Sequence, residues 1–140
     1  MPELAEILTA HTGLSRTVLQ YADITGHLVA EAKTPGFGAE GWAPLAQLVD
    51  TANFHRVGPF KDEMDWAGYV EFLTGWAATS EWECTFKRVT EHGDLVFLEL
   101  EERSVVGDYR SVVNTLSVYG FNDDGRIVRL DVYLQMEFPS

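Results

Sequence analysis

His55 is the side chain of this chain best suited to move a proton at neutral pH. It lies in a short extended stretch, residues 54–59, that ends in Gly58-Pro59. An unperturbed imidazole titrates at about pH 6.5, so it can give or take a proton at pH 7. We therefore take His55 as the first candidate for a general base; the alternative is a histidine that caps a strand end or faces solvent.

A carboxyl group, Glu102, continues an apolar face. Val96, Leu98 and Leu100 alternate with polar residues, and the same period reaches Glu102. Burial among apolar walls raises the pKa of a carboxyl, which makes it usable as an acid or base. Glu102 is thus a second candidate, with Leu100 as a pocket wall, unless the side chain lies at a solvated sheet end.

Alternation also sorts the last two predicted strands. Leu130 and Val132 share an apolar face and are candidate pocket walls, whereas Asp131 falls on the opposite face unless a bulge reverses it. The preceding strand is ambiguous, since either of its faces reads as apolar. One of those faces carries Ser117 as a candidate pocket residue and Tyr119 as a candidate donor of a hydrogen bond to a substrate oxygen.

The last two strands form the predicted framework. Residues 111–121 and 126–135 are rich in β-branched and aromatic side chains, and Asn122-Asp-Asp-Gly125 between them is a strong turn signal. Strands of about ten residues exceed the usual length of about five or six, so they must twist and curl. A curled sheet has a concave face, and we expect the rest of the chain to fill or line it.

Helices are expected to supply that filling. Helical periodicity covers residues 2–33 with a break at Gly13, residues 42–53 and residues 66–79. Ser15 and Asp65 are the predicted N-caps, and Trp66 is a predicted pocket wall. Two further strands, 82–91 and 95–105, complete an α+β fold. Its curled, cone-shaped antiparallel sheet, with four long strands and a short one, packs on three or four N-terminal helices.

Composition excludes several functions. A net charge of −12 disfavours nucleic-acid and membrane binding. The four histidines and the single Cys84 form no spaced ligand set, so we expect no metal, and no stretch indicates a cofactor. An acidic amino terminus without a basic signal region favours a cytoplasmic protein. The length of 140 residues favours one domain over residues 1–140.

The order of elements and the closing run Tyr119-Gly-Phe-Asn-Asp-Asp-Gly-Arg-Ile127 resemble the nuclear transport factor 2-like superfamily. Its members include ketosteroid isomerases, SnoaL-like polyketide cyclases, scytalone dehydratase and limonene epoxide hydrolase. The resemblance to ketosteroid isomerase implies that His55 occupies the position of the base and that Ser117 replaces the oxyanion-binding Asp. It also implies that Tyr21 is the oxyanion-donating Tyr.

Other matches to the superfamily are partial. Glu102-Arg103 resembles part of the Asp-Arg-Asp arrangement of the epoxide hydrolases, but Val105 stands where the second Asp is expected. Tyr133-Leu134-Gln135 resembles the common Tyr-x-Asp ending with Gln for Asp, and Asp131 is the candidate catalytic carboxyl that would replace this Asp, unless no residue does.

Two functions follow as hypotheses. The first is a cofactor-independent isomerase, cyclase or dehydratase that acts on a small apolar, polyketide-like or steroid-like ring by proton transfer in a hydrophobic pocket. The second is a non-catalytic ligand-binding or dimerisation module of the same fold, favoured by the acidic residues that the resemblance expects and the chain lacks. Because apolar side chains also occur on the outward sheet face, we further expect a homodimer.

Overall fold

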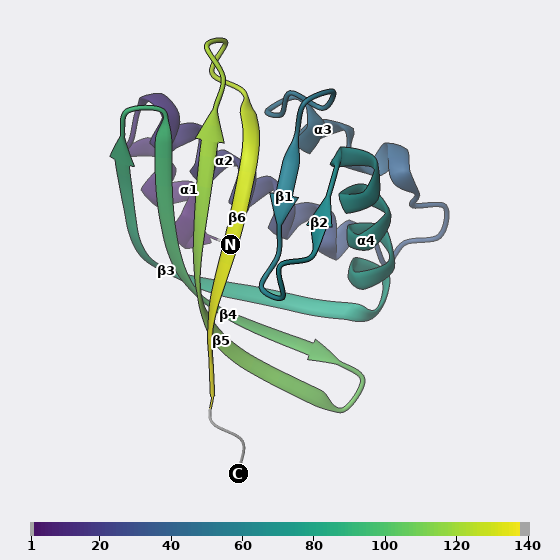
Figure 1. Cartoon of the computed structure of the whole chain (residues 1–140). Helices are drawn as coiled ribbons and strands as arrows, with labels where there is room; N and C mark the ends of the chain where they lie inside the picture. Colours follow the sequence, from purple (N-terminus) through teal and green to yellow (C-terminus); the bar gives the residue numbers. More distant parts are fainter. Residues whose placement is uncertain (1, 138–140) are drawn as a thin grey trace.

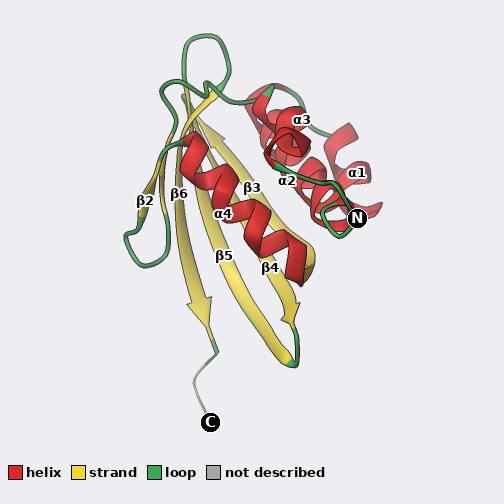
Figure 2. Ribbon diagram, turned by 90° about the vertical axis from the view of Figure 1, so that its right-hand side faces the viewer, coloured by secondary structure: helices red, strands yellow, loops and turns green. Residues whose placement is uncertain are grey.

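The computed structural model, which describes residues 2–137, is a curled six-stranded sheet with its helices on one face (Figures 1 and 2). The helices are α1 (Pro2–Thr9), α2 (Gly13–Glu31), the 3-10 turn η1 (Ala39–Trp42), α3 (Ala43–Ala46) and α4 (Trp66–Thr79). The strands are β1 (His55–Val57), β2 (Glu63–Met64), β3 (Ser80–His92), β4 (Leu95–Val106), β5 (Tyr109–Phe121) and β6 (Ile127–Met136). The predicted α+β class and curled antiparallel sheet are confirmed.

The sheet has the strand order β2-β1-β6-β5-β4-β3, and it is antiparallel except where β1 runs parallel to β6. Figure 2 shows α4 lying across the concave face, with α1, α2 and α3 on the same side. The tip of the β4–β5 hairpin extends past the end of α4 (Figures 1 and 2). The helices therefore cover most of one face and leave the other face of the sheet uncovered by any other part of residues 2–137.

The turn between β5 and β6 forms as its residues predict. The Asn122 side-chain oxygen accepts hydrogen bonds from the backbone N–H groups of Asp124 and Arg126 at 2.9 and 3.0 Å. Gly125 has a φ of 75°, a left-handed conformation that costs a glycine little. This turn fixes the register between β5 and β6.

The ambiguous face of β5 is settled by burial. Thr115, Tyr119 and Phe121 are buried on the concave side, and Thr115 and Tyr119 pair with Leu100 and Val96 of the inward series on β4. A register shift at Gly120/Phe121 places an extra residue in β6, so Ile127 and Leu130 are both buried although they are three positions apart.

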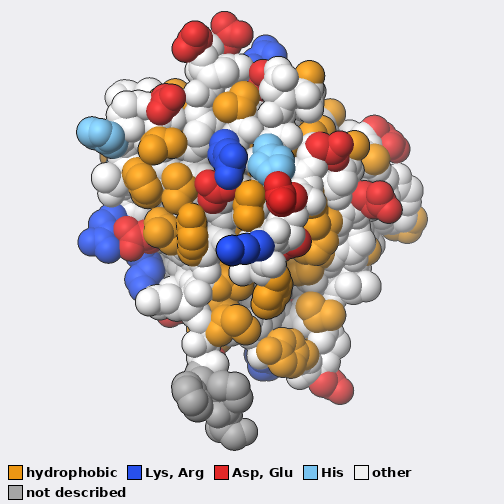
Figure 3. All heavy atoms as spheres, viewed as in Figure 1, with side chains coloured by type: hydrophobic (Ala, Val, Ile, Leu, Met, Phe, Trp, Pro, Cys, Tyr) orange, Lys and Arg blue, Asp and Glu red, His pale blue; other side chains and the backbone are white. Residues whose placement is uncertain are grey.

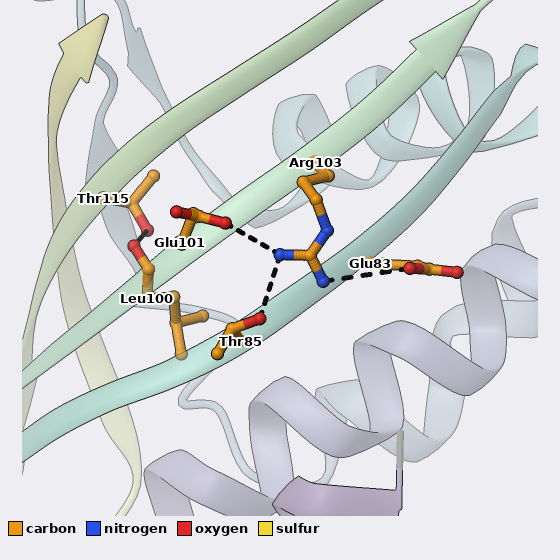
Figure 4. A network of polar contacts seen from close by, with 6 residues as sticks. All are labelled: Glu83, Thr85, Leu100, Glu101, Arg103 and Thr115. Atoms are coloured by element: carbon orange, nitrogen blue, oxygen red, sulfur yellow. Dashed lines mark hydrogen bonds and ion pairs between the residues drawn. The ribbon is translucent and has the colours of Figure 1, made fainter.

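The outward series on β4 is polar. Figure 4 shows Arg103 donating to Glu101 and to Thr85 of β3 and lying beside Glu83, while Thr115 bonds the Leu100 carbonyl. Glu101 and Glu102 are adjacent in sequence, and their side chains therefore lie on opposite faces of the sheet.

Two predicted helix details are wrong. The helix expected over residues 42–53 ends at Ala46, because the following residues join the sheet: Leu48 and Asp50 exchange backbone hydrogen bonds with Ile127. Ser15 is not the N-cap of α2, which begins at Gly13 after Thr12. Ser15 instead donates hydrogen bonds from its backbone N–H and its hydroxyl to Glu91, both at 2.8 Å. A carboxylate of β3 therefore accepts from a free backbone N–H in the first turn of α2.

Candidate active site

A cavity of about 180 Å³ lies between α2, α4 and the concave face of the sheet, and one side of it opens to solvent. Its polar lining residues are Tyr21, Thr25, Arg56, Tyr69, Glu102, Ser117 and Tyr119. Its apolar lining residues are Ala22, Phe72, Leu73, Trp76, Trp82, Leu100, Leu130 and Val132. A cavity of about 150 Å³ accommodates benzene, so this one has room for a single small ring.

Three phenol groups converge on the cavity. Tyr21 and Tyr119 meet edge to face with ring centroids 5.5 Å apart, and Tyr69 joins them from α4. Burial raises the pKa of Tyr21, Tyr69 and Tyr119 above the ordinary value of 10.0, and for Tyr21 the neighbouring Tyr69 and Tyr119 raise it further. All three therefore remain protonated hydrogen-bond donors at neutral pH.

Tyr21 keeps its hydroxyl available. The side chain is only 3% exposed, and its oxygen makes no hydrogen bond of good geometry within residues 2–137. The Tyr69 phenol is close enough to raise the pKa of Tyr21 further. A ligand oxygen placed beside Tyr21 would compete with the Tyr69 hydroxyl for this donor.

Arg56 brings a cation into the same space. The residue is 8% exposed, and its guanidinium carbon lies 4.8 Å from the centre of the Tyr69 ring and 5.7 Å from that of Phe72. Its only ion pair among the described residues is with Asp62, at a long 3.5 Å. Arg56 is thus held mainly by aromatic faces, an arrangement that favours a guanidinium over other side chains.

Glu102 supplies the carboxylate of the cavity. It accepts a hydrogen bond of 2.6 Å from the indole N–H of Trp82, and Trp82 in turn packs at 6.5 Å against the Trp76 ring. Glu102 and Arg56 come from strands at different positions in the sheet, β4 and β1, with β5 and β6 between them. The curled sheet brings a carboxylate and a guanidinium into one apolar cavity from different sides.

The structure brings seven of the ten predicted site residues together. Those that line the cavity are Tyr21, Leu100, Glu102, Ser117, Tyr119, Leu130 and Val132. They come from α2 and three strands; strand alternation predicted the side of Leu100, Glu102, Leu130 and Val132, whereas Tyr21 was a candidate through the family resemblance.

His55 does not line the cavity. In β1 it points away from the concave side, with its side chain 40% exposed and its Nε2 2.8 Å from a Glu63 carboxylate oxygen on β2. The correction has a simple cause: Arg56 pairs in register with the buried Leu130, so the neighbouring position must face outward.

Trp66 and Asp131 also lie outside the cavity. Trp66 occupies the first turn of α4, where it packs edge-on against Phe54 at 5.3 Å, and it lines a different crevice against η1 and α3. Asp131 lies on the outward face of β6, as its alternation favoured, and accepts from the Arg129 guanidinium at 3.1 Å.

Among the cavity residues that the sequence analysis did not predict, Arg56 and Tyr69 carry groups that can bind a ligand. The signal for Arg56 was present: Phe54 is apolar and buried, and Arg56 is two positions further along an extended segment. Tyr69 is a buried residue of α4, and nothing in its spacing separates a core tyrosine from one whose hydroxyl meets a cavity.

The described residues offer no metal site and no membrane span. No three His, Cys, Asp or Glu side chains gather closely enough within residues 2–137 to hold an ion. None of the helices in that range has the length and apolar character needed to cross a bilayer.

Comparison with solved structures gives similar chains of low sequence identity. A protein from Shewanella putrefaciens CN-32 classed as a SnoaL-like polyketide cyclase has a TM-score of 0.70 at 9% identity, with 96% of this chain and 88% of that chain covered. One from Kribbella flavida DSM 17836 classed as a ketosteroid isomerase has a TM-score of 0.56 at 15% identity, covering 83% and 82%. An LEH-like epoxide hydrolase from M. tuberculosis has a TM-score of 0.58 at 15% identity, covering 80% and 84%.

Sequence comparison adds no closer relative. No family model matches the chain, and no curated protein matches it. The similarity to known proteins is therefore one of structure, and it agrees with the resemblance that the helix order and the last hairpin indicated. The chain has the nuclear transport factor 2-like fold.

Proposed function

We propose that this protein is a cofactor-independent enzyme that moves a proton at a carbon next to a carbonyl group in a small ring compound. The observation that carries the proposal is the presence of one carboxylate, Glu102, and three protonated phenols in a single apolar cavity. The structurally similar chains include proteins named as a cyclase, an isomerase and an epoxide hydrolase, which supports small-molecule chemistry in this fold.

Glu102 is the proposed base. Its carboxylate takes the proton from the carbon, the electrons of the broken C–H bond form the enolate, and the enolate oxygen accepts hydrogen bonds from Tyr21 and Tyr119. Return of the proton to the γ-carbon of a dienolate gives isomerisation, whereas transfer of that proton from Glu102 to a β-hydroxyl lets the enolate expel water and gives dehydration. We assign the role of the base to Glu102 rather than to His55, because His55 lies on the other face of the sheet.

The volume of the cavity limits the size of the substrate. Drug-sized ligands usually occupy pockets of about 300–1,000 Å³, whereas this cavity measures about 180 Å³. A fused polyketide or steroid skeleton would therefore have to extend through the open side, past Phe72 and Trp76. A single ring with one carbonyl group is the substrate that the cavity fits best.

The test is deuterium exchange into small cyclic ketones in D₂O, followed by NMR, with cyclohexanone and 2-cyclohexenone as the first probes. We expect enzyme-dependent exchange at the carbon next to the carbonyl, and a loss of about 100-fold or more in Glu102→Gln. Gln keeps an acceptor for the Trp82 indole, so the fold should survive. Glu101→Gln on the opposite face is the matched control, and equal losses in both variants would refute the role of Glu102.

The second function, a non-catalytic ligand-binding module, is favoured by one observation. Four large aromatic side chains from α4 and β3 line the cavity, which measures only about 180 Å³: Tyr69, Phe72, Trp76 and Trp82. Saturable binding of the same ketones without any deuterium exchange in the wild-type protein would support this function over the enzyme.

A further inference from the structure

We propose that the ligand of this cavity carries a carboxylate and that Arg56 binds it, which makes the ligand class a small cyclic acid. The inference rests on the proposed function in taking this cavity as the ligand site, but it concerns a permanent charge on the ligand rather than the proton that Glu102 moves.

The position of Arg56 gives the first reason. Arg56 is only 8% exposed, and a buried guanidinium needs compensation by an anion and by hydrogen bonds. Asp62 gives little, because it is 3.5 Å away and its side chain is 40% exposed on the hairpin between β1 and β2. The Nε of Arg56 is buried without any hydrogen-bond partner within residues 2–137.

Unpartnered donors lie close together in this part of the cavity. The Tyr21 hydroxyl is the other one, and it is near enough to Arg56 for the guanidinium to lower the pKa that burial raises. Buried polar groups are nearly always paired in native proteins, so two such donors mark a place where a ligand supplies the acceptor. The two oxygens of a carboxylate match this set, one for the guanidinium and one for the phenol.

The charged side chains of the cavity determine the orientation of the bound ligand. Glu102 would repel a ligand carboxylate, and Arg56, entering from β1, would attract it. The acid group therefore points to Arg56, and the rest of the ring extends towards Glu102, Trp76 and Trp82. About 180 Å³ is enough for one six-membered ring with this substituent.

Benzoate and benzamide are the probes, because they have the same shape and differ in charge. Isothermal titration calorimetry with the full chain at low ionic strength should give a dissociation constant for benzoate at least about tenfold below that for benzamide. Acetate, which has the charge without the ring, should bind more weakly than benzoate. Equal affinity for benzoate and benzamide would overturn the proposal.

Three variants locate the effect. Arg56→Gln should remove the preference for benzoate. Asp62→Asn, which keeps the side-chain oxygen that Phe60 N–H bonds, should tighten benzoate binding by about two- to fivefold, because it removes a competing anion, and leave benzamide unchanged. Tyr21→Phe should weaken benzoate binding without abolishing it.

These variants also separate the two proposals. Because binding of benzoate involves no proton transfer, a preference that depends on Arg56 stands even if no ketone exchanges deuterium. If Arg56→Gln fails to fold, Asp62→Asn still decides: a purely structural Arg56 predicts no gain in benzoate affinity. A preference for benzoate that is unaffected by both variants would also overturn the proposal.

Discussion

The three cavity phenols tie the chemistry of the site to the stability of the protein. Burial raises the pKa of each one, most clearly for Tyr21 and Tyr119. A phenol that stays protonated can donate a hydrogen bond to an enolate at every pH at which the proposed base is charged. The alkaline limit of activity should therefore not come from these groups near neutral pH.

The same pKa values predict how stability depends on pH. Below about pH 10 both the folded and the unfolded chain keep these phenol protons, so their contribution is constant. As pH rises further, the unfolded chain releases them while the folded protein does not, and the free energy of unfolding falls. Urea unfolding at a series of values from about pH 8 to 11 should show this fall.

Tyr119→Phe should make the fall in the free energy of unfolding with pH less steep, because it removes one of the phenols with a raised pKa. Tyr109→Phe, which removes a phenol that is 69% exposed at the β4–β5 tip, is the control and should follow the wild-type slope. A Tyr119→Phe protein with the wild-type slope would contradict the cause that we assign.

Sequence reasoning predicted seven of the residues that line the cavity, but His55, its first candidate for a base, lies outside. Alternation selected Leu100, Glu102, Leu130 and Val132 because period two holds along regular strands. β1 has only three residues, too short for its own pattern to assign a face. The chemistry of imidazole favours His55 as a base, whereas the apolar Phe54, two positions before Arg56, indicates that Arg56 faces inward.

At the scale of elements, α4 connects a helix cap to the site. The Asp65 side chain accepts from the Gly68 N–H at 2.8 Å, which fixes the first turn of the helix that carries Tyr69, Phe72 and Trp76 into the cavity. The cap therefore stabilises the wall of the cavity as well as the helix.

Asp65→Ala should lower the free energy of unfolding by about 0.5–2 kcal/mol, the usual cost of losing an N-cap. Asp65→Asn keeps an acceptor and should cost much less. Urea denaturation at pH 7 measures both, and equal losses for Ala and Asn would point to the charge of Asp65 rather than to its hydrogen bond.

Elements with their own local signals were predicted well, and those set by distant partners were not. The β5–β6 turn follows from Asn122 and Gly125 alone. By contrast, the chain after Ala46 leaves its helix because Ile127, some eighty residues later, pairs with it. The two-residue strand β2 exists only through its pairing with β1, so no periodicity could show it.

At the scale of the whole molecule, the outward face of the sheet is the largest surface without a helix on it. Figure 3 shows hydrophobic side chains spread over this face between charged ones. Val112 and Tyr133 are large apolar residues exposed there, and Tyr133 pairs in register with Leu116. Such an apolar face favours association with another surface.

We propose that two copies pair through this face, as expected from the sequence. Sedimentation at high micromolar concentration should then give twice the 15.7 kDa of one chain. Tyr133→Glu should produce the monomer, because it places a charge in the centre of the contact. Phe60→Glu, at a side chain that is 82% exposed on the β1–β2 hairpin, should remain dimeric, and a wild-type monomer would refute the pairing.

The hydrogen bond from the Trp82 indole to Glu102 also makes the protein its own optical probe. Excitation increases the dipole of an indole ring, so the energy of its emission depends on the charge beside it. When Glu102 gains a proton or a ligand displaces solvent from this end of the cavity, the emission of Trp82 should shift. Trp82→Phe gives the difference spectrum that isolates this signal, and a stopped-flow fluorimeter could then follow occupancy of the cavity without any added dye.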